Sequence, residues 1–503
     1  MQGIVLRFVV VIALCILGSG RAWASSEKVA LARVDHALAE MYEGWAAYPA
    51  QGGGAAFTSS TQLLPVSRGW VQIDAVAVAD VRELQVKLEG LGMRGAVAYG
   101  RVISGWMSIS AIGDLAALAS LQFARPAYAT TNVGLVTSQG DQAMRADVAH
   151  TTFEVDGTDV TVGVLSTSFN CLGGADDDVA RDDLSPVAVI QEDPGCISGT
   201  DEGRAMLQLV HDVAPGASLA FATADTGQAG FASNILALQT AGADVIVDDV
   251  IYLAEPMFQD GIIAQAVNMV KTAGIPYFSA ASNSARQSYE SSFRAGPVFA
   301  DGAFLSAPGA RHFFGGIAHN FDPGPGVDVF QRITIPAGSG FTISFQWDSP
   351  FASACPVSPG CPGSPNDLDI YLFNDPPTTV LAGGTSRNIG GDAVEVFGYS
   401  NPPGSAVTAF NIMITKFDGP NPQLIKYVRF GGANVMINEF DTRSSTLYGH
   451  ANAAGAEAVG AAFYGNTPAF GVSPPSWRRS PRLGLPRSSS TRQGTAWRFP
   501  RFA

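Results

Sequence analysis

The chain has 503 residues, of which 47% are hydrophobic and 15% are charged, and its formal net charge is −14. A chain of this size and apolar content can bury several hydrophobic cores, which excludes a wholly disordered protein. The acidic balance argues against nucleic acid or an anionic membrane as a partner, because both repel negative charge.

Residues 1–24 have the features of a secretory signal. Arg7 precedes an apolar run from Val9 to Leu17, and the small residues Ala22 and Ala24 mark a cleavage position before Ser25. The apolar run is about half as long as the roughly 20 residues that cross a bilayer, so no stable membrane anchor is expected. We predict that the mature protein is secreted or periplasmic.

Cys15 lies within this signal, which leaves four cysteines in the mature chain. An even number of cysteines in an exported chain indicates disulfide bonds, and four cysteines allow three connectivities. We expect local pairing, Cys171 with Cys196 and Cys355 with Cys361. No Cys-x-x-Cys motif occurs and the six histidines are scattered, so a structural zinc site is not expected.

Residues 25–135 are predicted to form a small α+β domain. Its expected elements are a strand at 70–76, a helix at 80–91, two strands within 95–110, a helix at 111–121 and a strand at 123–128. This order is typical of a split βαβ domain. A generic α+β interaction domain is the alternative.

From Val160 onward, short runs of Val, Ile and Leu alternate with Ala-rich helical stretches, which is typical of a parallel sheet covered on both faces. The expected elements are strands at 160–166, 218–222, 245–250 and 275–280, and helices at 202–213, 230–241 and 262–273. We predict an α/β fold with a doubly wound parallel sheet over residues 140–308. The same pattern resumes at 446–475, where 456–461 is another expected strand.

Between residues 309 and 445 the pattern changes to alternation with period two, as in Thr342–Trp347, with Pro and Gly turns between the runs. This predicts a β-sandwich inserted into the α/β domain. Asp367 and Asp369 lie at the start of one of its strands and could bind Ca²⁺, although clustered acids there more often cap a turn. No cofactor is predicted, and calcium at these acids is the one alternative.

Three segments carry a resemblance to a known superfamily. Val162–Phe169 resembles V-x-V-I-D-[ST]-G, Val213–Leu219 resembles V-A-P-x-A, and Ile275–Asn283 resembles a strand ending in A-A-G-N. In this order the motifs resemble the subtilisin/sedolisin serine peptidases. The resemblance implies a subtilisin-like core, a propeptide-like role for residues 25–135, a protein or peptide substrate and a monomeric protein.

The resemblance also implies two site residues. Asn283 would donate its side-chain amide to the developing oxyanion, whereas an asparagine that caps a turn is the alternative. Glu202-Gly203 stands where the family has His-Gly, so Glu202 would be the catalytic base, as in sedolisins. Read without the family, Asp201-Glu202 is a capped helix start with negative charge at the helix N-terminus.

Other acids of the family pattern are missing or displaced. The strand at 160–166 has no orienting aspartate, and Thr167 takes the place of the acid in the related S-D-S-F pattern. Asp248 and Asp249 end an apolar strand, and alternation along that strand predicts that only one of them points into the cleft. The acids of 176–178 are expected to face solvent.

The nucleophile segment Gly-Thr-Ser-x-Ala-x-Pro does not occur in the chain. Residues 476–503 contain seven arginines and no acid, unlike the rest of the chain. A shift of reading frame after Pro475 would replace this aberrant tail by a sequence with the family's F-S-S-x-G phrase. A basic tail that binds a polyanion or a cell surface is the alternative.

Together these observations predict a secreted subtilisin-like serine endopeptidase homologue that is inactive as written, because the segment of the nucleophilic serine is missing. The alternative is a non-catalytic secreted protein that binds peptide or glycan.

Overall fold

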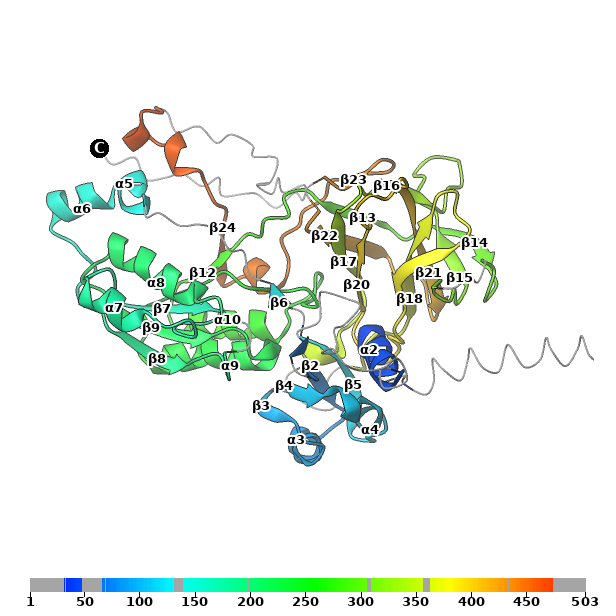
Figure 1. The fold of residues 1–503 in the computed structure, drawn as a ribbon, viewed down its shortest axis with the longest axis horizontal. Coiled ribbons are helices and arrows are strands. Elements are labelled where there is room, and N and C mark those ends of the chain that lie inside the picture. The colour runs from blue at the N-terminus through cyan, green and yellow to red at the C-terminus, as the bar shows by residue number, and fades with distance from the viewer. Residues whose placement is uncertain are drawn as a thin grey trace, which may run out of the picture.

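The computed structural model describes residues 31, 33–47, 66–67, 69–127, 129–130, 139–196, 199–304, 309–355, 362–432 and 434–473. The predicted signal, the Arg-rich tail and Cys361 lie outside these residues. Figure 1 shows an N-terminal α+β domain, an α/β domain and a β-sandwich side by side. Within the described part, no helix is both long and apolar enough to span a bilayer.

In its described residues, the N-terminal domain is an antiparallel sheet with three α-helices. Its elements are α2 (His36–Ala47), β1 (Val66–Ser67), β2 (Trp70–Ala77), α3 (Val81–Gly90), β3 (Arg94–Tyr99), β4 (Val102–Ser108), α4 (Ile112–Ala116) and β5 (Leu121–Pro126). From β2 to β5 they follow the predicted order of strand, helix, two strands, helix and strand. Because side chains alternate along β2, Ile73 packs with α3 of its own domain, whereas Asp74 and Val76 face the α/β domain.

The α/β domain contains a six-stranded sheet in the order β24-β12-β10-β7-β9-β8, and every neighbouring pair is parallel. Its strands are β7 (Thr161–Ser166), β8 (Val187–Gln191), β9 (Ser218–Thr223), β10 (Val245–Asp248), β12 (Tyr277–Ala280) and β24 (Ala456–Val459). Its helices are α5 (Gly140–Met144), α6 (Ala146–Phe153), α7 (Ala175–Ala180), α8 (Glu202–Val213), α9 (Gly227–Thr240) and α10 (Ile262–Thr272).

Helices cover both faces of this sheet, as the apolar runs predict. Leu165 of β7 lies in one apolar cluster with α9 and α10, whereas its neighbour Val164 lies in another with α7 and α8. Figure 1 shows α8 and α9 on opposite sides of the strands. The mixed α/β class with a parallel sheet is therefore confirmed.

The β-sandwich consists of two antiparallel sheets. One contains β13 (Ser288–Ser292), β22 (Leu424–Phe430), β17 (Gly340–Trp347) and β20 (Val394–Ser400). The other contains β14 (Ala295–Phe299), β15 (Gly316–His319), β21 (Ala409–Asp418), β16 (Gln331–Thr334), β23 (Met436–Ile437), β18 (Asp367–Asn374) and β19 (Val380–Gly384). Thus β13 and β14, which precede residue 309, already belong to these sheets.

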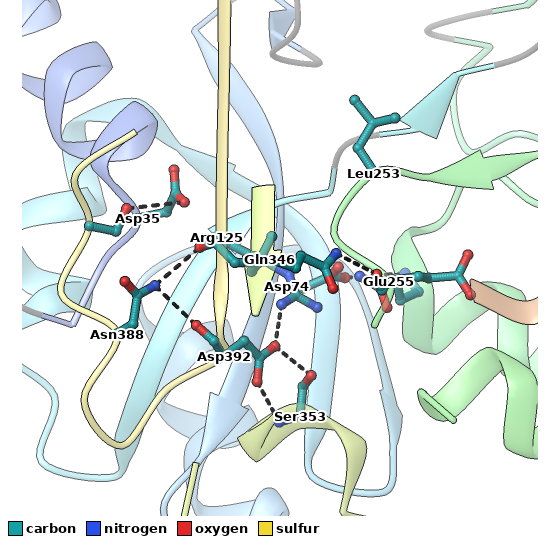
Figure 2. Close-up of polar contacts among 12 residues, drawn as sticks. Asp35, Asp74, Arg125, Leu253, Glu255, Gln346, Ser353, Asn388 and Asp392 are labelled. Atoms are coloured by element: carbon teal, nitrogen blue, oxygen red, sulfur yellow. Dashed lines mark hydrogen bonds and ion pairs between the residues drawn. The ribbon is translucent and has the colours of Figure 1, made fainter. Parts of the chain in front are cut away.

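The three parts meet at a buried polar junction. Arg125 of β5 forms an ion pair with Asp392 of the sandwich, and Asp392 also accepts hydrogen bonds from the backbone N–H and hydroxyl of Ser353. In Figure 2 the Gln346 side chain points to the loop that carries Leu253 and Glu255 in the α/β domain. One apolar cluster also joins the N-terminal domain to the sandwich. The sandwich is therefore attached to both other parts.

Candidate active site

The parallel sheet reverses its strand order at β7. This strand comes first in the sequence but lies inside the sheet, between β9 and β10, so the following connections diverge from it in opposite directions. Ligands of open α/β sheets bind beyond the carboxyl ends of the strands at such a switch point. Ser166 ends β7 and Asp248 ends β10 at this edge.

Asp248 and Asp249 point to different surroundings, as the alternation predicts. Asp248 is 2% exposed and accepts a hydrogen bond from the Ser279 hydroxyl of the neighbouring strand β12 at 2.9 Å. Like Ile246 two residues before it, Asp248 points to the face of the sheet that α9 and α10 cover. Asp249 is half-buried, and the charges that act on it include Glu202. The structure thus brings Asp249, from the β10 edge, close to the sequence-predicted residue Glu202.

Glu202 and Asp249 form a pair of carboxyl groups. Burial raises the pKa of Asp249 to about 8, with further increases from the carboxyls of Glu202 and Asp248, whereas the Ser166 hydroxyl lowers it. Within the described chain, Oε2 of Glu202 and Oδ1 of Asp249 are buried without a hydrogen-bond partner. Two adjacent carboxyls that retain one proton avoid mutual repulsion, and enzymes use such pairs for acid and base chemistry.

The start of α8 positions Glu202. The backbone N–H of Gly203 donates to the Ser168 carbonyl at 3.0 Å, and the Thr167 and Thr200 hydroxyls are 2.7 Å apart. A side chain at Gly203 would collide with the Phe221 ring on β9, so glycine permits the close approach of helix and sheet. Glu202 is therefore held beside the carboxyl end of β7.

Read without the family, Asp201-Glu202 predicts a capped helix start. The structure differs, because the side chain of Asp201 does not cap α8. Its backbone has a φ of 52°, and its carboxylate accepts hydrogen bonds from the Ser168 hydroxyl and from the N–H groups of Cys171 and Leu172. It also forms an ion pair with Arg204 at 3.1 Å. The carboxylate therefore fixes the loop after β7 instead of the helix terminus.

A disulfide bond lies in the same loop. Cys171 is bonded to Cys196, so the predicted local pairing is confirmed there. Cys355 is also disulfide-bonded, while its expected partner Cys361 lies outside the described residues. Asp176 and Asp177 are exposed at the start of α7, as expected for the acidic run 176–178. For Asp178 that prediction is wrong, because it is half-buried and forms an ion pair with Arg204 of α8 at 3.1 Å.

A second group of charges lies behind the pair, fully buried. His450 Nδ1 is 2.7 Å from Glu255 Oε1, and His450 Nε2 is 3.2 Å from Asp248 Oδ1. Burial lowers the pKa of His450, but the carboxylates of Glu255 and Asp248 outweigh burial and raise it to about 10. His450 is therefore an imidazolium between two carboxylates.

Sequence reasoning missed His450 and Glu255, which are 195 residues apart in the chain. His450 stands in the segment where the α/β pattern resumes, and Glu255 follows an apolar strand after two other acids. A histidine next to a glycine at the return point of an insertion was the available signal. Only the fold brings the two residues together.

Asn283 lies on the loop after β12, where its residue is exposed and the preceding Ser282 has a φ of 66°. Because β12 is the neighbour of β10, this loop begins at the same edge of the sheet as Asp249. No hydrogen bond joins the Asn283 side chain to another residue of the described chain. Its role as an oxyanion donor remains a prediction.

An extended segment of the chain lies next to this edge. β6 (Ala129–Thr130) pairs antiparallel with β11 (Ile251–Tyr252), with Thr130 opposite Ile251 and Ala129 opposite Tyr252. β11 begins just beyond Asp249 and Val250. β11 therefore pairs with an extended segment of the same chain close to the carboxyl pair.

The acids considered for calcium are buried in the sandwich. Asp369 accepts a hydrogen bond from the Tyr371 hydroxyl at 2.8 Å, and Asp367 Oδ1 accepts one from the Asn388 N–H at 3.2 Å. In the described ranges, no three His, Cys, Asp or Glu residues are arranged to hold a metal ion.

No family model matches the sequence, and no curated protein matches it. Among solved structures, the CspB protease of Clostridium perfringens is similar with a TM-score of 0.34 and 10% identity, over 70% of this chain and 78% of CspB. The self-cleaved protease domain of PatA has a TM-score of 0.19 and 17% identity, over 26% of this chain and 52% of that domain.

The PatG macrocyclase in complex with peptide has a TM-score of 0.19 and 11% identity, over 30% of this chain and 59% of PatG. The structural neighbours thus include proteases. At these similarities the functional proposal rests on the site itself.

Proposed function

We propose that the chain is a secreted homologue of subtilisin-like serine endopeptidases, with a carboxyl pair in place of the usual histidine base. The observation that carries the proposal is the position of Glu202 and Asp249 at the switch point of the sheet, beside the strand β11 that binds an extended segment. A peptidase needs both features, an ionisable base and a backbone edge that holds the substrate extended.

In this proposal each residue has a role set by its surroundings. Burial raises the pKa of Asp249 to about 8, so Asp249 is the proton-carrying member of the pair, and Glu202 is assigned the role of the base that accepts the proton of a nucleophile. Asn283 donates its amide to the oxyanion. A serine nucleophile would have to lie next to Glu202 in space. The sequence lacks the Gly-Thr-Ser-x-Ala-x-Pro segment that would supply it, and the nearby Ser166 is fully buried. We therefore propose that the chain is inactive as written.

The predicted signal and the Cys171–Cys196 disulfide support the proposal of an exported protein, because disulfide bonds persist in oxidising compartments. The N-terminal domain is proposed to have a propeptide-like role, and the support is the same β11 edge that is proposed to hold a peptide substrate. Its last strand, β6, occupies the β11 edge where a peptide would bind. The acidic chain is proposed to act as a monomer on protein or peptide substrates.

Peptide hydrolysis from pH 3 to pH 9 tests the proposal, with the chain as written and with the reading frame restored after Pro475. We expect no turnover by the chain as written. The restored protein should hydrolyse peptides below about pH 8, the pKa of Asp249. Glu202→Gln should abolish turnover, and the exposed control Asp177→Asn should retain it. Hydrolysis that survives Glu202→Gln would remove Glu202 from the mechanism.

Silence of the restored protein at every pH would favour the alternative, a non-catalytic protein that binds peptide or glycan. The missing orienting acid at Thr167, whose hydroxyl contacts Thr200, is the observation that gives this alternative its weight. Fluorescence anisotropy with labelled extended peptides then measures whether the chain binds peptide at all.

A further inference from the structure

A single cation neutralises two buried carboxylates behind the candidate site. Asp248 is 2% exposed, Glu255 is 0% exposed, and His450 is 1% exposed. Within the described ranges, His450 is the cationic side chain in contact with either acid. The carboxylate of Asp248 acts on the Tyr277 hydroxyl and that of Glu255 on the Tyr448 hydroxyl, and the ring of Phe231 packs edge-on against His450 at 5.1 Å.

Each ring nitrogen of His450 faces a carboxylate oxygen. Only the imidazolium, which carries a proton on both nitrogens, can donate a hydrogen bond to each of these oxygens. Asp248 Oδ1 accepts three hydrogen bonds, from Nε2–H of His450, from the Ser279 hydroxyl and from the backbone N–H of Val250. Removal of the imidazolium would leave Asp248 and Glu255 as buried unpaired charges, which a protein relieves by protonation or by movement of the backbone. The end of β10 therefore depends on His450.

Asp248 and Asp249 are consecutive residues at the end of one strand, so the direction of one fixes the direction of the other. While Asp248 is held on the face of the sheet that α9 and α10 cover, Asp249 is directed to the opposite face, where Glu202 starts α8. A rotation at Asp248 would turn Asp249 away from Glu202. The carboxyl pair is thus coupled through one backbone unit to His450.

His450 is itself placed by contacts that involve the sandwich. Its N–H donates to Glu255 Oε2 at 2.7 Å, and a side chain at Gly449, which has a φ of 67°, would meet the Glu255 carboxylate at 2.8 Å. On its other side, the loop 253–255 is bound by β17, because Ser344 donates to the Leu253 carbonyl and Gln346 to the Glu255 carbonyl. Figure 2 shows Gln346 against this loop.

We propose that His450 is a positioning residue that holds Asp248 against β12 and thereby keeps Asp249 directed at Glu202. His450 lies where the chain returns from the β-sandwich to the α/β domain. The inserted sandwich then completes the candidate site without contributing a residue that touches substrate. This inference rests on the proposed function only for the assignment of Glu202 and Asp249 as the working acids. Its test reads the protonation of these acids and needs no hydrolysis.

The experiment follows the carboxyl carbon of Asp249 by NMR in the full chain labelled with ¹³C-aspartate, with Asp249→Asn as the assignment variant. In the unmodified chain, Asp249 should titrate near pH 8, and Glu202→Gln should lower its midpoint. In His450→Gln, the midpoint should fall toward the ordinary aspartate value of about 3.9 and should no longer respond to Glu202→Gln. Gly449→Ala, which keeps the imidazole but blocks its docking, should act in the same direction.

His319→Gln is the matched control, because His319 is equally buried but lies in the sandwich and bonds Tyr289. It should leave the Asp249 midpoint unchanged. Circular dichroism identifies which variants are folded, and Gly449→Ala serves if His450→Gln is not. An unchanged Asp249 midpoint in a folded variant overturns the proposal. A midpoint that rises and still responds to Glu202→Gln also overturns it, because His450 would then act through its charge alone.

An Asp249 that titrates as an ordinary aspartate in the unmodified chain would instead contradict the carboxyl pair, and with it the proposed function. The two ideas therefore fail by different results of one measurement.

Discussion

One substitution can separate the two main causes of the high pKa of Asp249. Burial is the larger cause, and the carboxyl of Glu202 is the second. Glu202→Gln removes the carboxyl charge but keeps the shape of the side chain. We expect the midpoint of Asp249 to fall below about 8 yet stay above about 3.9, because burial remains. Carbon-13 NMR of labelled aspartate measures it.

The matched control for that measurement is Asp177→Asn, which removes an exposed carboxylate on α7. It should leave the Asp249 midpoint in place. An equal midpoint in Glu202→Gln and the unmodified chain would show that the two carboxyls do not interact.

Asp201 presents a different case at the same scale, since its carboxylate is 5% exposed and is fully engaged by Ser168, Cys171, Leu172 and Arg204. Asp201→Asn retains the size but loses the charge and replaces one acceptor by a donor. Hydrogen bonds to a charged group contribute about 1.5–3 kcal/mol, so we expect the free energy of unfolding to fall by about 2 kcal/mol or more. Urea denaturation measures the loss, and Asp177→Asn should change it by less than about 0.5 kcal/mol.

At the scale of elements, α8 depends on a glycine that helix propensity alone disfavours. In Gly203→Ala the added methyl group would gain about 1 kcal/mol of helix propensity. It would also collide with the Phe221 ring and lie 2.8 Å from the Ser168 carbonyl, and overpacking costs typically 1–3 kcal/mol. The collision should dominate, because the Phe221 ring lies on β9 and the Ser168 carbonyl is backbone of the loop that follows β7. We expect net destabilisation in urea denaturation.

Gly90→Ala at the end of α3 provides the comparison, because a Cβ there meets nothing within 4 Å. It should be neutral or stabilising by up to about 1 kcal/mol. Equal effects of the two substitutions would show that α8 can move away from β9 without cost.

The elements that the sequence predicted well are those with a strong periodic pattern. The helix at Glu202–Val213 has the bounds that its amphipathic pattern predicted, and β7, β9 and β12 lie in buried apolar runs. β8 was missed because it is an edge strand with mostly exposed side chains. β13 and β14 were missed because Ser288–Ser292 is polar and Ala295–Phe299 is largely exposed, so neither shows a clear alternation.

The candidate site was predicted in part for a related reason. Glu202 could be found because it stands at a helix start within a recognisable motif, and Asp249 because it ends an apolar strand. His450 could not, because its role depends on contact with Glu255 across 195 residues of intervening chain. Long-range charge pairing leaves no local pattern in a sequence.

At the scale of the whole molecule, buried ionisable groups make stability depend on pH with opposite signs in different parts. The pKa of His450 is raised to about 10, so its contribution is complete below about pH 6.5 and is lost as pH rises through 10. The raised pKa of Asp249 acts in the same direction, since its contribution is complete below about pH 3.9 and is lost as pH rises through 8.

His319 in the sandwich acts in the opposite direction. Burial, followed by the charge of Arg294, lowers its pKa to about 3. Its neutral ring accepts the Arg294 N–H on Nδ1, which leaves Nε2 to donate to the Tyr289 hydroxyl. The contribution of His319 is therefore complete above about pH 6.5 and is lost as pH falls toward 3.

These signs predict that two substitutions change opposite limbs of one stability curve. Urea denaturation between pH 3 and pH 11 should show that His319→Gln flattens only the acid limb, whereas His450→Gln flattens the alkaline limb and lowers stability at pH 6.5. The loss for His450→Gln should be about 3–5 kcal/mol, because it leaves buried carboxylates without their cation. The alkaline limb of His450→Gln, plotted as the free energy of unfolding against pH, could instead keep the slope of the unmodified chain. His450 would then not be the imidazolium that links the segment after the sandwich to the carboxyl ends of the parallel strands.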